Sequence, residues 1–290
     1  MVVMTVTGAG HRATTAGHKA RSAGQDAASS RWLQWLARGG LVARGVMYLL
    51  IGVLAVQIAF GSSGKQADTS GALRAVATHP GGIVVLWLLA VGFAGLAIWR
   101  FAEVAYGQAG PGGRKAGKRL GSLARAVLYA FICGSVVSFI LGTGGKTSGN
   151  TQSKDATATL MAHGGGRWLV ALIGVGIGIG GVALAVYGIR GKFLKHLHLT
   201  QMSRRTAKVV KTLGVVGYVA RGVVFCVAGG FLVDAAVSFS PQKAQGIDGS
   251  LLKLATTPLG PGLLVAVALG LVVFGVYSGC EARWREVEPG

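Results

Sequence analysis

Three arginines interrupt apolar segments of this chain, and each lies in the same short pattern. The segments GLVARGVMY, GSLARAVLY and GYVARGVVF place Arg44, Arg125 and Arg221 four residues after a glycine and four residues before an aromatic residue. Residues four apart lie on one face of a helix, so the glycine, the guanidinium group and the ring share a stripe. Because arginine stays charged in proteins and forms forked hydrogen bonds with carboxylates, the chemistry expected of these residues is ion pairing.

Two glutamates are the candidate partners of these arginines. Glu103 and Glu281 each lie four residues after an aromatic residue, at the end of a later apolar segment. In an antiparallel hairpin the start of the first helix is level with the end of the second, which predicts structural ion pairs Arg44–Glu103 and Arg221–Glu281. The second copy has no matching acid, so Arg125 must use a carboxylate of a neighbouring repeat or stay solvated. The alternative for all three arginines is that they extend to lipid headgroups at the membrane surface.

A second polar layer follows the arginines by thirteen residues and consists of Gln57, Ser138 and Asp234. At about 1.5 Å per helical residue, this layer lies roughly 20 Å further across, in the outer half of a membrane. Asp234 is the acidic residue inside an apolar run, and intramembrane carboxylates are candidates for proton or cation relays. The alternative is an aspartate that lies close to the outer surface, where it is wet or hydrogen-bonded to Ser238.

The sequence offers no constellation of catalytic residues: it has no nucleophile–base pattern, no HExxH motif and no carboxylate pair at catalytic spacing. The segment GTGGKTSG lacks the first glycine of a phosphate-binding loop, because Ile140 occupies that position. The glycine-rich segment GVGIGIGG at 174–181 is expected to be a helix-packing face. Cys133, Cys226 and Cys280 are expected to be small buried hydrophobes. We therefore expect no enzymatic activity, no cofactor and no metal.

The composition is that of an integral membrane protein. Of 290 residues, 51% are hydrophobic and only 13% are charged, and the mean hydropathy is +0.56. Six apolar stretches account for these values, and each approaches the ~20 residues that a helix needs to cross a bilayer. They are Leu41–Phe60, Ile83–Arg100, Leu120–Gly142, Trp168–Ile189, Leu213–Val237 and Gly262–Cys280.

The net charge of +20 is distributed unevenly between the two sides of the predicted membrane. Of 29 basic residues, only seven fall in the first, third and fifth connections: Lys65, Arg74, Lys146, Lys154, Arg167, Lys243 and Lys253. This positive-inside bias predicts that both termini are cytoplasmic. Topology thus explains the charge without nucleic acid, and the basic face is expected to favour anionic lipids.

Residues 1–30 are small, polar and basic, and they contain no apolar segment of signal-peptide length. They are expected to form a disordered cytoplasmic tail without a cleaved signal. A transit peptide is the less favoured alternative, based on the basic composition with little acid.

The repeated arginine pattern predicts the fold. Each copy precedes a helix–connection–helix unit, which divides the chain into hairpins at 31–110, 111–195 and 196–290. In the outer connections, Ser70, Thr157 and Ser250 are candidate N-caps of a short helix. Since each unit crosses the membrane twice, all three insert in the same orientation. The predicted fold is an all-α bundle of six transmembrane helices in three tandem hairpins, with pseudo-threefold symmetry about the membrane normal.

The arginine-containing helix starts, the connection GALRAVATHPGG and the helix ending GLAIWRFAEVAYG resemble an actinobacterial membrane family, domain of unknown function 1206, which has three tandem two-helix repeats. The resemblance covers about Leu36 to Glu286 and is weakest in the second repeat, where Ala126 replaces glycine and Gly164 replaces proline. It implies the six-helix topology and a bacterial plasma membrane, and it brings no catalytic residues to carry over.

Two classes of function fit these features. The first is a pathway for small solutes or ions that uses Asp234 and the layer of Gln57 and Ser138. The second is a non-catalytic membrane scaffold whose basic cytoplasmic face binds a protein partner or anionic lipid. The sequence does not indicate whether the chain forms a homo-oligomer.

Overall fold

The computed structural model describes residues 31–60, 67–107, 115–143, 149–246, 249–251 and 260–285. The predicted tail at 1–30 lies outside the described residues, as do Lys65, Lys146 and Lys253 of the predicted outer connections.

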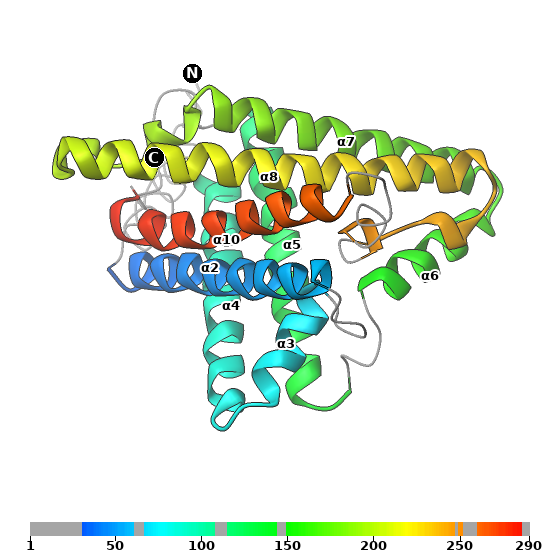
Figure 1. Cartoon of the computed structure of the whole chain (residues 1–290), viewed down its shortest axis with the longest axis horizontal. Helices are drawn as coiled ribbons and strands as arrows, with labels where there is room; N and C mark the ends of the chain where they lie inside the picture. Colours follow the sequence, from blue (N-terminus) through cyan, green and yellow to red (C-terminus); the bar gives the residue numbers. More distant parts are fainter. Residues whose placement is uncertain are drawn as a thin grey trace, which may run out of the picture.

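The described chain is built from helices (Figure 1). The long helices are α2 (Arg31–Ala59), α4 (Gly82–Tyr106), α5 (Ala116–Ile140), α7 (Gly166–Ile189), α8 (Arg204–Val237) and α10 (Gly260–Trp284). The shorter elements are α3 (Thr69–Ala77), α6 (Gly149–Met161), η1 (Lys192–His196), η2 (Leu199–Gln201) and η3 (Pro241–Lys243).

All six long helices are long and apolar enough to cross a membrane. Their order matches the six stretches predicted from the sequence, with α2 and α4, α5 and α7, and α8 and α10 forming the three predicted repeats. The chain is therefore an all-helical multi-pass membrane protein, as predicted.

Short helices occupy the first two outer connections, but their starts differ from the predicted N-caps. Asp68, rather than Ser70, caps α3: its carboxylate accepts hydrogen bonds from the Gly71 backbone N–H at 2.9 Å and from the Ser70 hydroxyl at 2.6 Å. Thr157 lies inside α6, which begins earlier, at Gly149. An aspartate is as good an N-cap as a serine, so the sequence around 68–70 contained both candidates.

The helices pack most extensively between repeats. The three largest helix–helix contacts join the second helix of one repeat to the first helix of the next: α4 to α5, α7 to α8, and α10 back to α2. This cyclic order is what threefold pseudo-symmetry predicts. The second repeat departs from the symmetry within its own hairpin: α2 packs on α4 and α8 packs on α10, whereas α5 and α7 make no extensive contact with each other in the described chain (Figure 1). In this view α7, α8, α10 and α2 lie side by side, and α4 and α5 run across them.

Small residues make the close contacts between repeats. A Cβ atom at Gly45 would lie 2.8 Å from the Gly275 carbonyl oxygen, and one at Gly181 would lie 2.7 Å from the Gly222 carbonyl oxygen. Gly174 makes a similar approach to Gly229, so the predicted packing face of α7 is confirmed at Gly174 and Gly181, whereas a Cβ atom at Gly176, Gly178 or Gly180 would have no neighbour within 4 Å among the described residues. Small residues let helix backbones approach closely inside a membrane, where burial of apolar surface contributes little.

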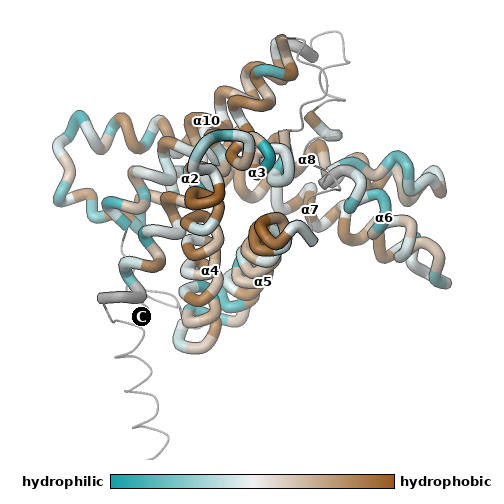
Figure 2. Tube along the Cα trace, turned by 90° about the horizontal axis from the view of Figure 1, so that it is seen from below, coloured by the Kyte–Doolittle hydropathy of each residue, from teal (hydrophilic) through white to brown (hydrophobic). Residues whose placement is uncertain are grey.

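The outer helices present apolar surface away from the protein. In the most apolar 18-residue stretch of α5, only 17% of the residues are buried, and the share in α7 is the same. The corresponding share in α4 is 56%. Figure 2 shows apolar colour along α4 and α5, with polar colour at α3 in the outer connection. The exposed apolar side chains are those expected to contact lipid.

Candidate functional site

A group of charged side chains lies between the helices, near the middle of α2 and α8 and near the ends of α4 and α10. We call Arg44, Arg100, Arg221 and Arg285, together with Glu103 and Glu281, the arginine cluster. Of these, Arg44, Arg100, Glu103 and Glu281 are buried, each 6% exposed or less. Burial of so many charges is costly, so their arrangement must provide partners for most of them.

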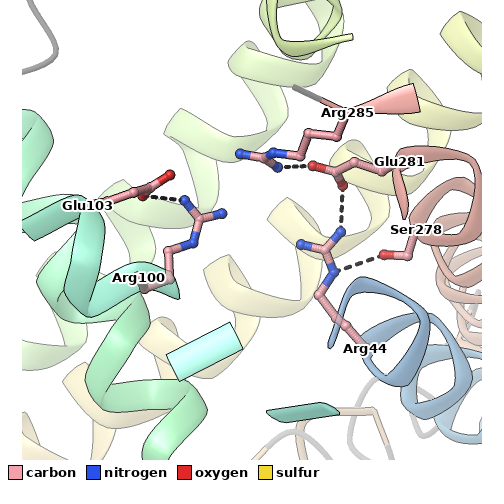
Figure 3. A network of polar contacts seen from close by, with 6 residues as sticks. All are labelled: Arg44, Arg100, Glu103, Ser278, Glu281 and Arg285. Carbon is pink, nitrogen blue, oxygen red and sulfur yellow. Dashed lines mark hydrogen bonds and ion pairs between the residues drawn. The ribbon is translucent and has the colours of Figure 1, made fainter. Parts of the chain in front are cut away.

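Arg44 and Glu281 form the best-satisfied pair of the cluster. Arg44 Nη2 donates to Glu281 Oε2 at 2.5 Å, and Arg44 Nε donates to the Ser278 hydroxyl at 2.8 Å (Figure 3). Arg285 donates to the other oxygen of Glu281. Both oxygens of this carboxylate are therefore engaged, and α2 of the first repeat is tied to α10 of the third.

Glu103 has different partners. Its Oε2 atom accepts from Arg100 Nη1 at 2.7 Å and from the Ser122 hydroxyl at 2.7 Å. Ser122 lies on α5, so this contact links the first repeat to the second. In Figure 3 the Arg100–Glu103 pair faces the Arg44–Glu281–Arg285 group.

The predicted pairs Arg44–Glu103 and Arg221–Glu281 are therefore wrong, because the pairing runs between repeats. Gly45 packs on Gly275, which places Arg44 against the end of the helix that precedes its own repeat in the cyclic order. The acid that closes that helix is Glu281, not Glu103. The prediction assumed that the two helices of one hairpin make the closest contact.

The same register identifies what the second repeat lacks. Gly275 packs on Gly45, the residue after Arg44, and Gly181 packs in the same way on Gly222, the residue after Arg221. Glu281 follows Gly275 by six residues, and Tyr187 follows Gly181 by six. Tyr187 thus takes the place of the acid that would face Arg221.

Arg221 lies among aromatic rings instead of carboxylates. Its guanidinium carbon is 4.5 Å from the centroid of the Phe274 ring, 5.0 Å from that of Tyr48 and 5.8 Å from that of Phe225. Ring faces attract cations, although they do not accept hydrogen bonds as a carboxylate does. No ion pair of Arg221 occurs among the residues that the structure describes.

Arg125 is exposed and makes no ion pair within the described ranges, which agrees both with the solvated alternative and with contact to lipid headgroups. The acid nearest its expected level, Glu103, is already bound by Arg100 and Ser122.

The cluster carries more positive than negative charge. Four guanidinium groups share two carboxylates, which leaves two net positive charges. The Nε atoms of Arg100, Arg221 and Arg285 are buried and have no hydrogen-bond partner within the described part of the chain. An unsatisfied buried donor costs about 1–3 kcal/mol, so these groups are candidates for binding an anion.

The connection between α7 and α8 covers the end of the cluster. His198 N–H donates to the Trp284 carbonyl oxygen at 2.9 Å, and Leu197 forms an isolated β-bridge with Arg285. Phe193 of this connection is buried, with its ring 5.3 Å from that of Tyr277. Burial lowers the pKa of His196 in η1, and the nearby Arg285 charge lowers it further. His196 is therefore expected to be neutral near pH 7.

The outer polar layer does not form a comparable site. The Asp234 carboxylate lies 3.3 Å from Lys243 Nζ, with both side chains about half exposed, at 50% and 44%. The Ser238 hydroxyl donates to the Asp234 backbone carbonyl. These are the contacts of the interfacial alternative. Ser138 is half-buried on α5, and Gln57 lines a mainly apolar groove of about 700 Å³ between α2, α3 and α4.

Sequence reasoning missed Arg100, Ser278, Arg285 and Ser122 as members of the site. Arg100 had a readable signal: it is a charged residue at the end of an apolar stretch, three residues before Glu103 and thus on the same face of the helix. Ser122 and Ser278 had none, since a serine in a membrane helix is common and gains its role only from the neighbouring helix.

Comparison with known proteins agrees with the repeat structure. A family model described as Domain of Unknown Function (DUF1206) matches residues 39–107, 120–191 and 216–285. Glu103, Tyr187 and Glu281 each lie four residues before the end of a match, which supports their equivalence. The chain is similar to Uncharacterized protein YxxB of Bacillus subtilis (strain 168), with 31% identity over 249 residues, or 85% of this chain and 89% of the relative. No solved structure matches the chain.

Proposed function

Because the chain belongs to the DUF1206 family, with three copies of its two-helix module in one multi-pass membrane protein, we propose that it forms a pathway for small anionic solutes and binds them at the arginine cluster. The role proposed is binding and conduction, without a catalysed reaction. The membrane is the bacterial plasma membrane.

The observation that carries this proposal is the charge of the cluster, whose four arginines are paired with only two carboxylates among the residues that the structure describes. Arginine is not deprotonated in proteins, so the two surplus positive charges persist at every physiological pH. Insertion scales give a cost of about 2.5–3.5 kcal/mol for an ionised arginine at mid-membrane, and less nearer the surface. An anion that enters the cluster offsets this cost, whereas a cation is repelled.

The geometry favours anions over the cation relay considered from the sequence. Asp234, the acid on which that relay would depend, is exposed and paired with Lys243 at the surface. An exposed pair of this kind is screened by solvent and contributes about 0–1 kcal/mol.

The orientation of the pathway follows from the distribution of charge. The arginine cluster lies at the same end of the bundle as the basic connection between α7 and α8, which contains Lys192 and Lys195. Since basic connections stay on the cytoplasmic side, the cluster and both termini are expected to face the cytoplasm. Maleimide labelling of single cysteines placed at Lys154 and Lys195 tests this: only the cysteine at position 154 should react in intact cells.

Anion flux from proteoliposomes tests the function. The full-length chain, reconstituted in neutral lipid, should release nitrate, chloride or phosphate faster than protein-free liposomes do. R221Q removes a cluster arginine that holds no ion pair in the described chain, and it should reduce the flux about tenfold, since a charge-assisted hydrogen bond contributes ~1.5–3 kcal/mol. R167Q is the matched control, because Arg167 packs over Trp168 and Phe239 at the opposite end of the bundle.

Two results would contradict the proposal. One is a protein that releases cations instead of anions, and the other is a folded protein that releases neither. The second result would favour the scaffold alternative, which predicts that deletion of residues 1–30 removes a co-purifying partner and leaves the arginine cluster dispensable.

A further inference from the structure

We propose that the arginine cluster is a site for an oxyanion of the phosphate class, which carries two negative charges, such as hydrogenphosphate or a phosphate monoester. This inference names the ligand of the proposed function and rests on it for the location of the site. It depends on the number of surplus charges, the geometry of the free donors and the position of the cluster.

The charge of the ligand follows from the charge of the cluster. Arg44 and Arg285 share Glu281, and Arg100 is bound to Glu103, so the local charge is plus two once Arg221 is included. A phosphate monoester carries about −1.5 to −2 charges at pH 7 and therefore neutralises this surplus. A halide or nitrate ion carries one negative charge and leaves one arginine uncompensated.

The free donors indicate an anion with several oxygen atoms. The unpartnered Nε atoms belong to three side chains on different parts of the bundle: Arg100 on α4, Arg221 on α8 and Arg285 after α10. Arg100 is only 3% exposed. Planar guanidinium groups match the oxygen atoms of phosphate through paired hydrogen bonds. A tetrahedral anion presents acceptors in several directions at once, as three separate arginines require.

The aromatic rings bring these arginines together. Arg100 and Arg285 both lie over the Trp99 ring, at 4.3 and 4.8 Å from its centroid. Arg44 and Arg221 both lie over the Phe274 ring, at 5.3 and 4.5 Å. Glu281 joins the two halves, since both Arg44 and Arg285 donate to its carboxylate. The guanidinium groups are thus held close to one another by stacking, although their like charges repel.

Arg44 has a different role from the other three. Its Nε atom is already bonded to Ser278 and its Nη2 atom to Glu281. We assign it to holding the site together, and we assign the contact with the ligand to Arg100, Arg221 and Arg285.

The phosphate group has two sources that share this chemistry. One is a free anion in solution, and the other is the headgroup of an anionic phospholipid. Glu281 and Arg285 lie at the end of the α10 span, near the level of lipid headgroups, whereas Arg44 and Arg221 lie deeper in α2 and α8. Inorganic phosphate and dioctanoyl phosphatidic acid are the probes that distinguish these sources.

Equilibrium binding to the full-length chain in a phosphate-free neutral detergent tests the inference. Radiolabelled inorganic phosphate should bind, and a hundredfold excess of chloride or nitrate should not displace it. R221Q should weaken binding about tenfold or more, as expected for loss of one charge-assisted donor, and R167Q should change it less than about twofold. R221K keeps the charge but loses the planar fork, and it should give an intermediate affinity.

The folded state of each variant is checked by gel filtration and by its thermal unfolding curve, and R221K provides the comparison if R221Q does not fold. Binding of phosphatidic acid but not inorganic phosphate, with the same dependence on Arg221, supports the site and assigns the lipid as its source. Binding of neither probe, or equal displacement by chloride, overturns the phosphate assignment.

The binding experiment tests the phosphate assignment, and the flux experiment tests the proposed pathway, so each proposal can be contradicted without the other. Flux of small anions without binding of either phosphate probe would remove the phosphate assignment and retain the proposed pathway. Binding that depends on Arg221 without any flux would retain the oxyanion site and remove the pathway.

Discussion

Arg44 Nη2 lies 2.5 Å from Glu281 Oε2, a contact between the first repeat and the third across 237 positions of sequence. Within the described residues, only one of the three repeated arginines makes such an ion pair. In the other two repeats Glu103 is bound by Arg100, and a tyrosine stands in the place of the acid. The three repeats therefore differ at this contact, and the tyrosine in the second repeat accounts for one of the two surplus positive charges of the cluster.

Among the described ion pairs, loss of the Arg44–Glu281 pair should destabilise the protein most. E281Q leaves Arg44 and Arg285 without a carboxylate, and breaking a buried pair from one side costs about 3–5 kcal/mol. Its folded yield and thermal unfolding temperature should fall sharply. D234N is the matched control, because the same acid-to-amide change removes an exposed pair with Lys243 and should cost at most ~1 kcal/mol. An equal loss of stability in the two variants would show that Glu281 does not hold α2 and α10 together.

The close packing of α7 on α8 predicts that two glycine-to-alanine changes in α7 have opposite effects on stability. A Cβ atom at Gly181 would lie 2.7 Å from the Gly222 carbonyl oxygen, so G181A should cost about 1–3 kcal/mol through overpacking. A Cβ atom at Gly176, on the same helix, would have no neighbour within 4 Å among the described residues, and G176A should stabilise the helix by ~0.5–1 kcal/mol. Thermal unfolding in detergent measures both. A neutral G181A variant would contradict the close packing of α7 on α8.

The sequence contained the fold because the signals for it are local and repeated. Six apolar stretches and three copies of the arginine pattern require only the length of a membrane helix and the spacing of its residues. The short helix α3 was likewise readable from a candidate cap, Ser70, although the residue that caps it is Asp68, two positions earlier.

The pairing of charges could not be read from the sequence, because it depends on which helix is the nearest neighbour. The prediction placed Arg44 beside Glu103 by assuming contact within the hairpin, whereas α2 packs more extensively on α10 of the third repeat than on α4 of its own. Gly45 and Gly275 are the residues at which α2 and α10 approach, but the sequence does not show that these two glycines face each other. The role of Ser278, which bonds Arg44, has the same origin.

The covering connection should respond to acid through His196. Its pKa is lowered in the folded state, below the unfolded value of about 6.5, so protonation opposes folding. The stability contributed by neutral His196 is fully present above pH about 6.5 and is lost as the pH falls through the lower folded-state pKa. Between about pH 7 and pH 5, the unfolding temperature of the wild type should fall more steeply than that of H196Q. Parallel curves for the two proteins would exclude His196 as the titrating group.

An acid placed at position 187 should reduce the net positive charge of the cluster. Tyr187 occupies the position of Glu103 and Glu281, so Y187E supplies a carboxylate at the level where Arg221 lacks one. The new pair should remove one net positive charge and engage a donor that the anion would otherwise use. The affinity for inorganic phosphate should then fall about tenfold, the effect of losing one charge-assisted hydrogen bond.

Two controls separate this effect from the loss of packing. Tyr187 contacts the rings of Tyr218 and Phe193, with centroids at 5.2 and 6.5 Å, so any replacement that removes the ring disturbs this group. Y187Q has the shape of Y187E without its charge, and Y187F keeps the ring. Only Y187E should weaken phosphate binding strongly, because only Y187E changes the charge. If Y187Q weakens binding as much as Y187E does, packing rather than charge sets the affinity, and the arginine surplus is not what attracts the anion.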